Sequence, residues 1–196
     1  MSSLSTEAGQ SRRFLLRART AEAHDALDRM IGPFDSLESY RRYLAGIGGF
    51  RLPLEAKLRQ AVWPLALEGL RPQDFGLLIR QDQDDLGMTS QEEPGTEETQ
   101  HFEGATSAAA LFGTLYVLEG SNLGARLLYK RAQALGLGPD HGARHLAAQA
   151  ERNDRWSRFL QALEAADAIE IDEIALASRA AFAAAQTAFR RAFHGA

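Results

Sequence analysis

The chain has 196 residues, of which 45% are hydrophobic, so it is long enough to bury the core of a single domain. Its 22 Lys and Arg residues against 26 Asp and Glu residues give a net charge of −4, which excludes a general basic field for nucleic acid or anionic lipid. The absence of cysteine excludes disulfides, thiolate metal sites and cysteine nucleophiles. No signal-peptide pattern and no apolar run of membrane-spanning length occur, so we expect a cytoplasmic protein that binds neither nucleic acid nor membrane.

Apolar residues recur at helical spacing along almost the whole chain, and β-branched residues never alternate over the length of a strand. The sequence therefore predicts an all-α fold, with residues 1–11 disordered and residues 12–196 in one helical domain. The polar, acidic segment 87–104 is expected to be a surface loop, and Pro53 is expected to kink or split the second helix. The predicted helices cover residues 12–30, 37–62, 73–86, 107–135, 142–166 and 172–193.

Three glycines lie within the long helix predicted over residues 107–135, namely Gly113, Gly120 and Gly124. Their spacing places them on one narrow face of that helix. Each glycine costs about 1 kcal/mol relative to alanine inside a helix, so a close approach on that face must compensate for the loss. Two interpretations stay open. A neighbouring helix packs against the glycines, or a flat, bulky ligand lies against the bare backbone with the hydroxyl of Ser121 at the edge of its site.

A ligand with a reactive centre would need an anchor on another element, and the first predicted helix offers His24 in LRARTAEAHDALD. Arg17 lies two helical turns before it, roughly 10 Å along the axis, and Asp28 lies one turn after it. This spacing provides an imidazole for a metal, a guanidinium at the distance of a macrocycle's acidic edge, and a carboxylate able to orient the imidazole. The alternative is a surface histidine surrounded by charged neighbours.

These two segments together resemble the heme oxygenase family, in particular its bacterial, biliverdin-producing members that are paired with bacteriophytochromes. TAEAHDALD places His24 at the position of the family's axial heme ligand, with Asp28 keeping the imidazole neutral, and LYVLEGSNLGARLL matches the glycine-bearing helix across the heme. The resemblance extends from about Arg13 to Phe193. It implies a single-domain, all-α fold that holds heme between the first helix and the glycine helix, and oxidative cleavage of heme with O2 to biliverdin, ferrous iron and carbon monoxide.

The resemblance also assigns roles to residues of the glycine helix. Gly120 and Gly124 would let the backbone press against the ring and steer O2 toward one meso carbon. Ser121 stands where animal enzymes carry an aspartate, and Ala125 stands where they carry a second consecutive glycine. Because a serine orders water but holds no charge, the proton route of the animal enzymes does not transfer directly to this chain. Tyr116 lies on the glycine face and could contact the ring or a water.

Further residues are expected at the edges of the heme by the same resemblance. Arg17 is the preferred partner of a propionate. The helix that contains ERNDRWSRF offers Arg155 or Arg158 as a second cation, and the sequence does not choose between them. Phe182 and Phe189, seven residues apart on the last helix, would form a wall of the pocket, although without the resemblance both would be assigned to the core.

Partners follow from what the sequence lacks and from the resemblance. No nicotinamide- or flavin-binding motif is present, so electrons would come from an external donor, a ferredoxin or a flavoprotein reductase. Arg126, Lys130 and Arg131 could receive an acidic donor, and a bacteriophytochrome could accept the product. The alternative function is that of a heme-binding or heme-sensing protein that has kept the pocket but lost turnover.

A non-heme di-iron oxygenase is the main chemical alternative, since such proteins are also helical. Their sites need two Glu-x-x-His motifs on facing helices, and the chain offers one, Glu98 to His101, inside the acidic segment. His141 and His145 lie one helical turn apart and could in principle bind a metal. They have no carboxylate pair near them in the sequence, so we expect both at the start of a surface helix.

Overall fold

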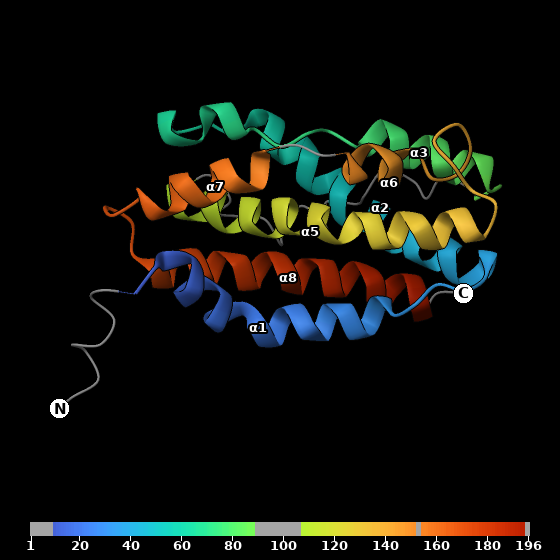
Figure 1. The fold of residues 1–196 in the computed structure, drawn as a ribbon, viewed down its shortest axis with the longest axis horizontal. Helices are drawn as coiled ribbons and strands as arrows, with labels where there is room; N and C mark the ends of the chain where they lie inside the picture. Colours follow the sequence, from blue (N-terminus) through green and yellow to red (C-terminus); the bar gives the residue numbers. More distant parts are fainter. Residues whose placement is uncertain (1–9, 89–106, 152–153, 195–196) are drawn as a thin grey trace.

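The computed structural model describes residues 10–88, 107–151 and 154–194. Within these ranges every regular element is a helix, which confirms the predicted all-α fold (Figure 1). The elements are α1 (Arg12–Ile31), α2 (Leu37–Gln60), the 3-10 helix η1 (Leu65–Leu70), α3 (Gly76–Asp85), α5 (Ala108–Ala134), α6 (Arg144–Ala150), α7 (Arg155–Glu164) and α8 (Ile171–His194).

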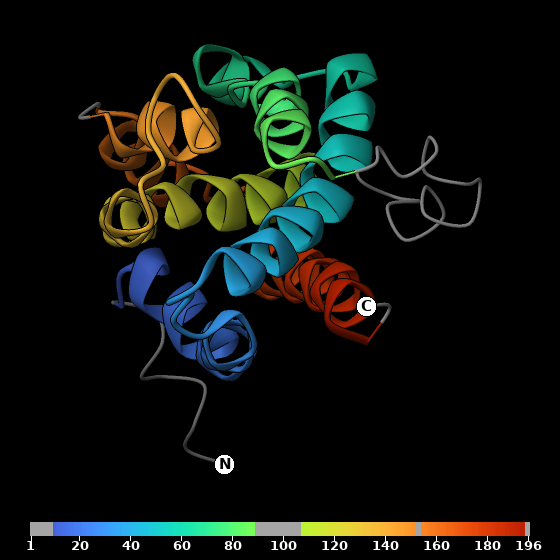
Figure 2. The same ribbon diagram turned by 90° about the vertical axis from the view of Figure 1, so that its right-hand side faces the viewer.

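Helix α8, the last element, packs against α1, α2 and α5. The first helix lies along the last one in the same direction. The carbonyl of Arg19 accepts a hydrogen bond from Nη1 of Arg179 at 3.3 Å, and the carbonyl of Ala23 accepts one from Nε2 of Gln186 at 3.0 Å. The shorter helices α3, α6, α7 and η1 form a second group beyond α5 (Figure 2). The first and the last described helices therefore lie side by side on one side of the molecule.

Apolar residues at helical spacing produce this packing. In α8 buried side chains recur every three or four residues, so one face of the helix enters the core. The predicted apolar stripe of α2 is likewise buried, apart from the partly buried Ile47. The buried residues are Ile174, Ala175, Ser178, Ala181, Phe182, Ala185 and Phe189 in α8, and Tyr40, Tyr43, Leu44, Phe50 and Leu54 in the stripe of α2.

Four of the predicted helices agree with the structure to within two residues at each end, and α2 is one of them. It is not split at Pro53, although a proline inside a helix removes a backbone hydrogen bond. Phe50 and Leu54, on either side of the proline, are both buried in the core. Their packing keeps both halves of α2 in one helix.

The connection between α2 and α3 differs from the prediction. The third helix was expected to start at Gln73 and instead begins at Gly76, after a 3-10 helix that the sequence did not predict. One oxygen of the Glu55 carboxylate accepts the backbone N–H groups of Phe75 and Gly76, at 3.1 and 2.9 Å. This side chain from α2 supplies the acceptor that the first turn of α3 needs, and so sets where that helix starts.

The single helix predicted over residues 142–166 is wrong, because the structure has two helices there, α6 and α7. Asp82 of α3 fixes the start of α6 by accepting the backbone N–H groups of Arg144 and His145. α7 packs instead on η1 and α5. A continuous helix could not make both sets of contacts.

Most of the N-terminal segment 1–11 and most of the loop predicted over 87–104 lie outside the described residues. Among the residues that are described, no helix combines the length and the apolar character needed to cross a lipid bilayer.

Candidate functional site

His24 lies on the outer half of α1, and its side chain is 56% exposed. Its Nδ1 atom is 3.3 Å from a carboxylate oxygen of Asp28 and 3.8 Å from one of Asp25. The imidazole and the ring of the buried Phe182 on α8 form a T-shaped pair, with ring centroids 5.9 Å apart and planes at 77°. A carboxylate on Nδ1 and a ring against one edge orient the imidazole and leave Nε2 for a ligand.

α1 and α5 meet one helical turn before His24. The hydroxyls of Thr20 on α1 and Tyr116 on α5 are 3.4 Å apart. Both helices run in the same direction (Figure 1), and residues four apart share a helix face. His24 and Gly120 therefore follow this contact on the two facing sides, each one turn further along its own helix.

The three glycines of α5 have two different surroundings. A Cβ atom at Gly113 would lie 2.6 Å from the Cβ of Ala177, 2.7 Å from the backbone nitrogen of Ser178 and 2.8 Å from the carbonyl of Ile174. Helix packing is thus the reason for glycine at position 113, as one of the two interpretations held. It is not the reason further along the helix.

A Cβ atom at Gly120 would meet only one atom within 4 Å, a ring carbon of Trp156 at 3.9 Å, and a Cβ atom at Gly124 would meet nothing within 4 Å. Apart from this ring carbon of Trp156, no atom of the described residues lies within 4 Å of the two positions, so the backbone of this part of α5 has open space beside it. Bare backbone on one helix and an oriented imidazole on the facing helix are what a flat ligand with a metal at its centre requires. The residues present fit heme in this respect.

Ser121 and Ala125, the residues that follow these two glycines, both make contacts within the protein. The hydroxyl of Ser121 donates a hydrogen bond to the carbonyl of Leu118 at 2.7 Å. Ala125 is buried, with 1% of its surface exposed, and belongs to the apolar core. Ser121 can therefore offer its lone pairs to a water, while its proton stays with its own helix.

The three candidate cations are in different situations. Arg17 is exposed on α1, two turns before His24, and its side chain makes no hydrogen bond or ion pair with the described residues. Arg155 donates from Nε and Nη2 to the buried carboxylate of Glu119, at 2.9 and 2.6 Å. Arg158 donates to the carbonyl of Gly69 at 2.9 Å. Only Arg17 stands on the helix that carries the imidazole and is available to a ligand.

The aromatic candidates separate in the same way. Phe182 contacts His24, as described above, whereas Phe189 is buried against α2, with its ring 6.0 Å from that of Tyr43. A Cβ atom at Gly46 of α2 would clash with the ring of Phe189 at 2.3 Å, so this ring fills a space that glycine leaves. Phe182 lies beside the imidazole, and Phe189 lies in the core.

Tyr116 joins a group of aromatic rings between α5 and α7. Its ring lies 5.9 Å from that of Trp156 and 6.3 Å from that of Phe159. Trp156 in turn stacks on Phe159, at 5.6 Å and 26°. This cluster fixes Tyr116, and through Thr20 it fixes the separation of α1 and α5 next to the site. The sequence did not identify it, although Trp156 and Phe159 stand three residues apart in ERNDRWSRF.

A second feature missed by the sequence is a group of charged residues buried on the far side of α5. Glu119, one residue before Gly120, is 3% exposed and is paired with Arg155. On α2, Arg51 and Glu55 are 2% and 3% exposed. The available signals were a glutamate inside the apolar run LYVLEG and an Arg and a Glu one turn apart in the buried stripe of α2.

The expectation of a surface position is wrong for His145, and the expectation that no carboxylate pair lies near is wrong for both His141 and His145. The side chain of His145 is completely buried, and Nδ1 is 2.7 Å from Asp82 of α3. His141 is exposed, 3.4 Å from Asp85. Asp82 and Asp85 form the carboxylate pair that the sequence hid, because they precede the histidines by more than 50 residues.

Arg144 occupies the space between these two carboxylates and pairs with both. Burial lowers the pKa of His145, against the opposing effect of Asp82. The described residues hold no group of three or more His, Asp and Glu side chains that could bind a metal ion, and the Glu98–His101 motif of the di-iron alternative lies outside them. Asp82, Arg144 and His145 therefore join α3 to α6.

Comparison with known proteins agrees with this geometry. Residues 13–192 match the family described as heme oxygenase. The chain is 34% identical over 179 residues to the heme oxygenase PigA of Pseudomonas aeruginosa, and the match covers 87% of both proteins. It is also similar to the NO- and CO-bound heme oxygenase from Neisseria meningitidis, with a TM-score of 0.69, 28% sequence identity, and coverage of 94% of this chain and 93% of that one. The chain therefore belongs to the heme oxygenase family and is an enzyme that degrades heme.

Proposed function

We propose that the protein opens heme to biliverdin and releases ferrous iron and carbon monoxide, using O2 and electrons from an external donor. The observation that carries this proposal is the pairing of an oriented imidazole on α1 with bare backbone on the facing turn of α5. Heme is the substrate and also supplies the iron at which O2 reacts. The chain's own residues bind, orient and enclose it.

His24 is the proposed axial ligand of the heme iron. The Asp28 carboxylate lies 3.3 Å from Nδ1 and can orient the imidazole through that atom, so that Nε2 is presented to the iron. Phe182 packs against one side of the imidazole and limits its rotation. Arg17 on the same helix holds a heme propionate by a charge-assisted hydrogen bond, whereas Arg155 and Arg158 are less suited because both already have partners.

Gly120 and Gly124 form the opposite wall. Without Cβ atoms, the backbone of α5 approaches the ring closely on the side where O2 reacts, and it limits the meso carbons that the oxygen can reach. Ser121 and Tyr116 border this wall, and their hydroxyls can order water there. Ala125 lies one residue beyond Gly124 and packs inward, which keeps the wall thin.

Electrons come from a ferredoxin or a flavoprotein reductase in the cytoplasm. Lys130 is exposed near the C-terminal end of α5, and Arg126 and Arg131 lie within one turn of it. An acidic donor would be attracted to these cations despite the net negative charge of the chain. A bacteriophytochrome is the proposed acceptor of the biliverdin.

The direct test adds hemin to the purified protein, followed by a reducing system and O2. We expect the hemin complex to show the absorption spectrum of a histidine-ligated heme. After reduction in the presence of O2, the absorption of biliverdin should appear. A ferrous chelator should then detect the released iron, and a globin should detect the carbon monoxide. Heme that stays intact under these conditions would contradict the proposal and favour a heme-binding or heme-sensing function.

The ligand assignment has its own test. His24→Ala should remove the axial nitrogen, abolish normal turnover and change the heme spectrum, and added imidazole should restore the spectrum. His141→Ala, at the other exposed histidine described here, is the matched control and should leave both unchanged. An unaltered spectrum in the His24 variant would contradict the assignment.

A further inference from the structure

One face of α8 holds α1 through three side chains, Arg179, Phe182 and Gln186, whose spacing of three and four residues places them on the same side of the helix. Gln186 makes the hydrogen bond that lies nearest in the chain to the proposed iron ligand. Its Nε2 atom donates to the carbonyl oxygen of Ala23 at 3.0 Å, and both residues are half-buried. This carbonyl belongs to the peptide group that joins Ala23 to His24, so the hydrogen bond acts on the backbone that carries the imidazole.

The hydrogen bond from Gln186 restricts how α1 can move along α8. Inside a helix each carbonyl oxygen already accepts the N–H group four residues further on, so a second donor has to approach the remaining lone pair from outside the helix. An N–H···O hydrogen bond weakens outside a separation of about 2.7–3.2 Å, so a shift of α1 by roughly half an ångström would already strain this contact. Gln186 therefore fixes the position of α1 along the last helix (Figure 1).

α1 is also held on the side that faces α5. The hydroxyls of Thr20 and Tyr116 are 3.4 Å apart, one turn before His24. The contacts at Thr20 and at Ala23 lie within one turn of each other on α1 and come from two different helices. Together they set both the position and the rotation of the turn that carries the imidazole.

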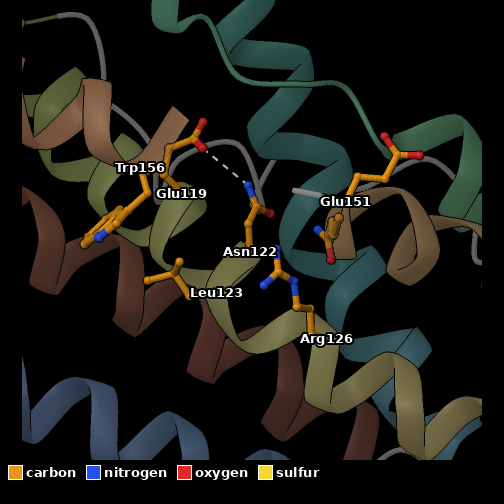
Figure 3. A pocket seen from close by; sticks show the side chains of 7 residues that line it. Glu119, Asn122, Leu123, Arg126, Glu151 and Trp156 are labelled. Atoms are coloured by element: carbon orange, nitrogen blue, oxygen red, sulfur yellow. Dashed lines mark hydrogen bonds between the residues drawn. The ribbon is translucent and has the colours of Figure 1, made fainter. Parts of the chain in front are cut away.

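The opposite wall of the site is packed less tightly. A cavity of about 80 Å³ lies beside α5, and its lining includes Glu119, Asn122 and Leu123, which belong to the same turns as Gly120 and Gly124 (Figure 3). Residues beside such a space lack packing partners on that side and move more easily. The precision with which the imidazole faces the glycine turns therefore depends on how firmly α1 is held.

The other hydrogen bond from α8 to a carbonyl of α1 lies further from His24. The carbonyl of Arg19 accepts it from Arg179, and the side chain of Arg19 is also bound to α8 by an ion pair with Asp172 at 2.8 Å. Loss of the hydrogen bond from Gln186 leaves these contacts in place. Its effect should therefore be confined to the turn that carries the imidazole.

We propose that Gln186 is a positioning residue for the iron ligand, because its amide fixes the peptide group that precedes His24. This inference rests on the proposed function, since it treats the imidazole as the ligand of the heme iron. With the backbone of this turn fixed, Nε2 of His24 stays at bonding distance from the iron, and the ring is held against the glycine turns of α5. Without the amide the turn moves away from α8, and the iron–nitrogen bond becomes longer and weaker.

Gln186→Met tests this role, because methionine keeps the length of the side chain and has no N–H donor. Gln186→Lys restores a donor of similar reach. Arg179→Met is the matched control, since it removes the other hydrogen bond from α8 to a carbonyl of α1 while the ion pair of Arg19 with Asp172 remains. Resonance Raman spectra of the ferrous heme complex measure the iron–histidine stretching frequency, and biliverdin absorption measures the rate of turnover.

In Gln186→Met the iron–histidine stretching frequency should fall, and heme cleavage should slow by about 2- to 10-fold, the range that loss of one hydrogen bond usually costs. Gln186→Lys should restore both the frequency and the rate. Arg179→Met should leave both close to those of the unmodified protein, although it too removes a contact between the two helices. A purely structural role for Gln186 would lower the stability of both methionine variants without changing the frequency.

A heme-free measurement separates this inference from the proposed function. Amide hydrogen exchange around Ala23 and His24 should be faster in Gln186→Met than in Arg179→Met or the unmodified protein. Thermal unfolding checks that each variant is folded. Unchanged exchange at this turn, an unchanged stretching frequency in folded Gln186→Met, or equal changes in Arg179→Met would overturn the positioning role while leaving heme cleavage intact. Failure of the unmodified protein to cleave heme would instead overturn the proposed function.

Discussion

The imidazole of His24 and the ring of Phe182 meet edge to face, with centroids 5.9 Å apart. His24 belongs to α1 and Phe182 to α8, so the orientation of the proposed iron ligand is set by the last helix of the chain. Phe182 is 4% exposed and serves both the core and the site. Its two functions can be separated by comparison with Phe189, which is also buried in the same helix but contacts α2.

Phe182→Ala and Phe189→Ala should each lower the free energy of unfolding by about 3–5 kcal/mol, the usual cost of deleting a buried aromatic ring. Urea unfolding without heme measures this loss. The two variants should differ in heme binding, because the imidazole loses its neighbour in only one of them. We expect weaker binding and an altered spectrum of histidine-bound heme for Phe182→Ala alone. Equal effects of both variants on the spectrum would contradict the proposed position of Phe182.

Gly113→Ala and Gly124→Ala should have opposite effects on the heme-free protein. The new methyl group at Gly113 meets backbone atoms of α8 at 2.7 and 2.8 Å, so it should destabilise the fold by about 1–3 kcal/mol. At Gly124 nothing lies within 4 Å, and the better helix propensity of alanine should stabilise the fold by up to about 1 kcal/mol. Thermal unfolding distinguishes the two.

In the presence of heme, Gly124→Ala should bind its substrate less well than the unmodified protein, although its heme-free fold is more stable. A methyl group at Gly124 occupies the space assigned to the ring, so heme titration should show weaker affinity and turnover should slow. Unchanged affinity and turnover in Gly124→Ala would mean that heme does not lie against this turn.

Arg155→Ala should destabilise the protein by about 3–5 kcal/mol, because it leaves the buried carboxylate of Glu119 without its partner. Arg158→Ala removes an exposed hydrogen bond to the carbonyl of Gly69 and a largely exposed ion pair with Asp154 that is 4.0 Å long, so its effect should stay within about 1 kcal/mol. Chemical denaturation compares the two variants. If Arg158→Ala were the more damaging change, the assignment of Arg155 to the core of the fold would be wrong.

The stability of the protein should fall as the medium becomes acidic, partly because of His145. Burial holds the pKa of His145 below its ordinary value of 6.5. The unfolded chain therefore binds a proton more readily than the folded one, so the contribution of His145 is present above pH 6.5 and is lost as pH falls below it. The free energy of unfolding of His145→Gln should depend less on pH in this window, whereas His141→Gln should follow the unmodified protein.

The sequence predicted the helical class and most helix ends, and it singled out the two segments that carry His24 and the glycines. It succeeded there because apolar spacing and glycine position are local signals. The break between α6 and α7 was missed, since it is caused by Asp82, a residue more than 60 positions earlier that captures the start of α6. The burial of His145 was missed for the same reason, because it too depends on contact with Asp82.

The residues of the candidate site stay a prediction, and only part of their surroundings could be inferred from the sequence. His24, Asp28 and the glycines could be recognised from their spacing within single helices. The sequence could not show that Gly113 packs against a helix while Gly124 has open space beside it, because this difference depends on where α8 lies. From the sequence alone, Arg155 was likewise equivalent to Arg158. The structure distinguishes them, because Arg155 pairs with Glu119 of another helix.

The first helix of this chain lies against the last one, and that arrangement has a consequence for biosynthesis. While the ribosome is still adding α8, His24 lacks the ring of Phe182 and α1 lacks the bond from Gln186. A nascent chain that still lacks α8 therefore lacks both of these contacts, which position α1 and the proposed iron ligand.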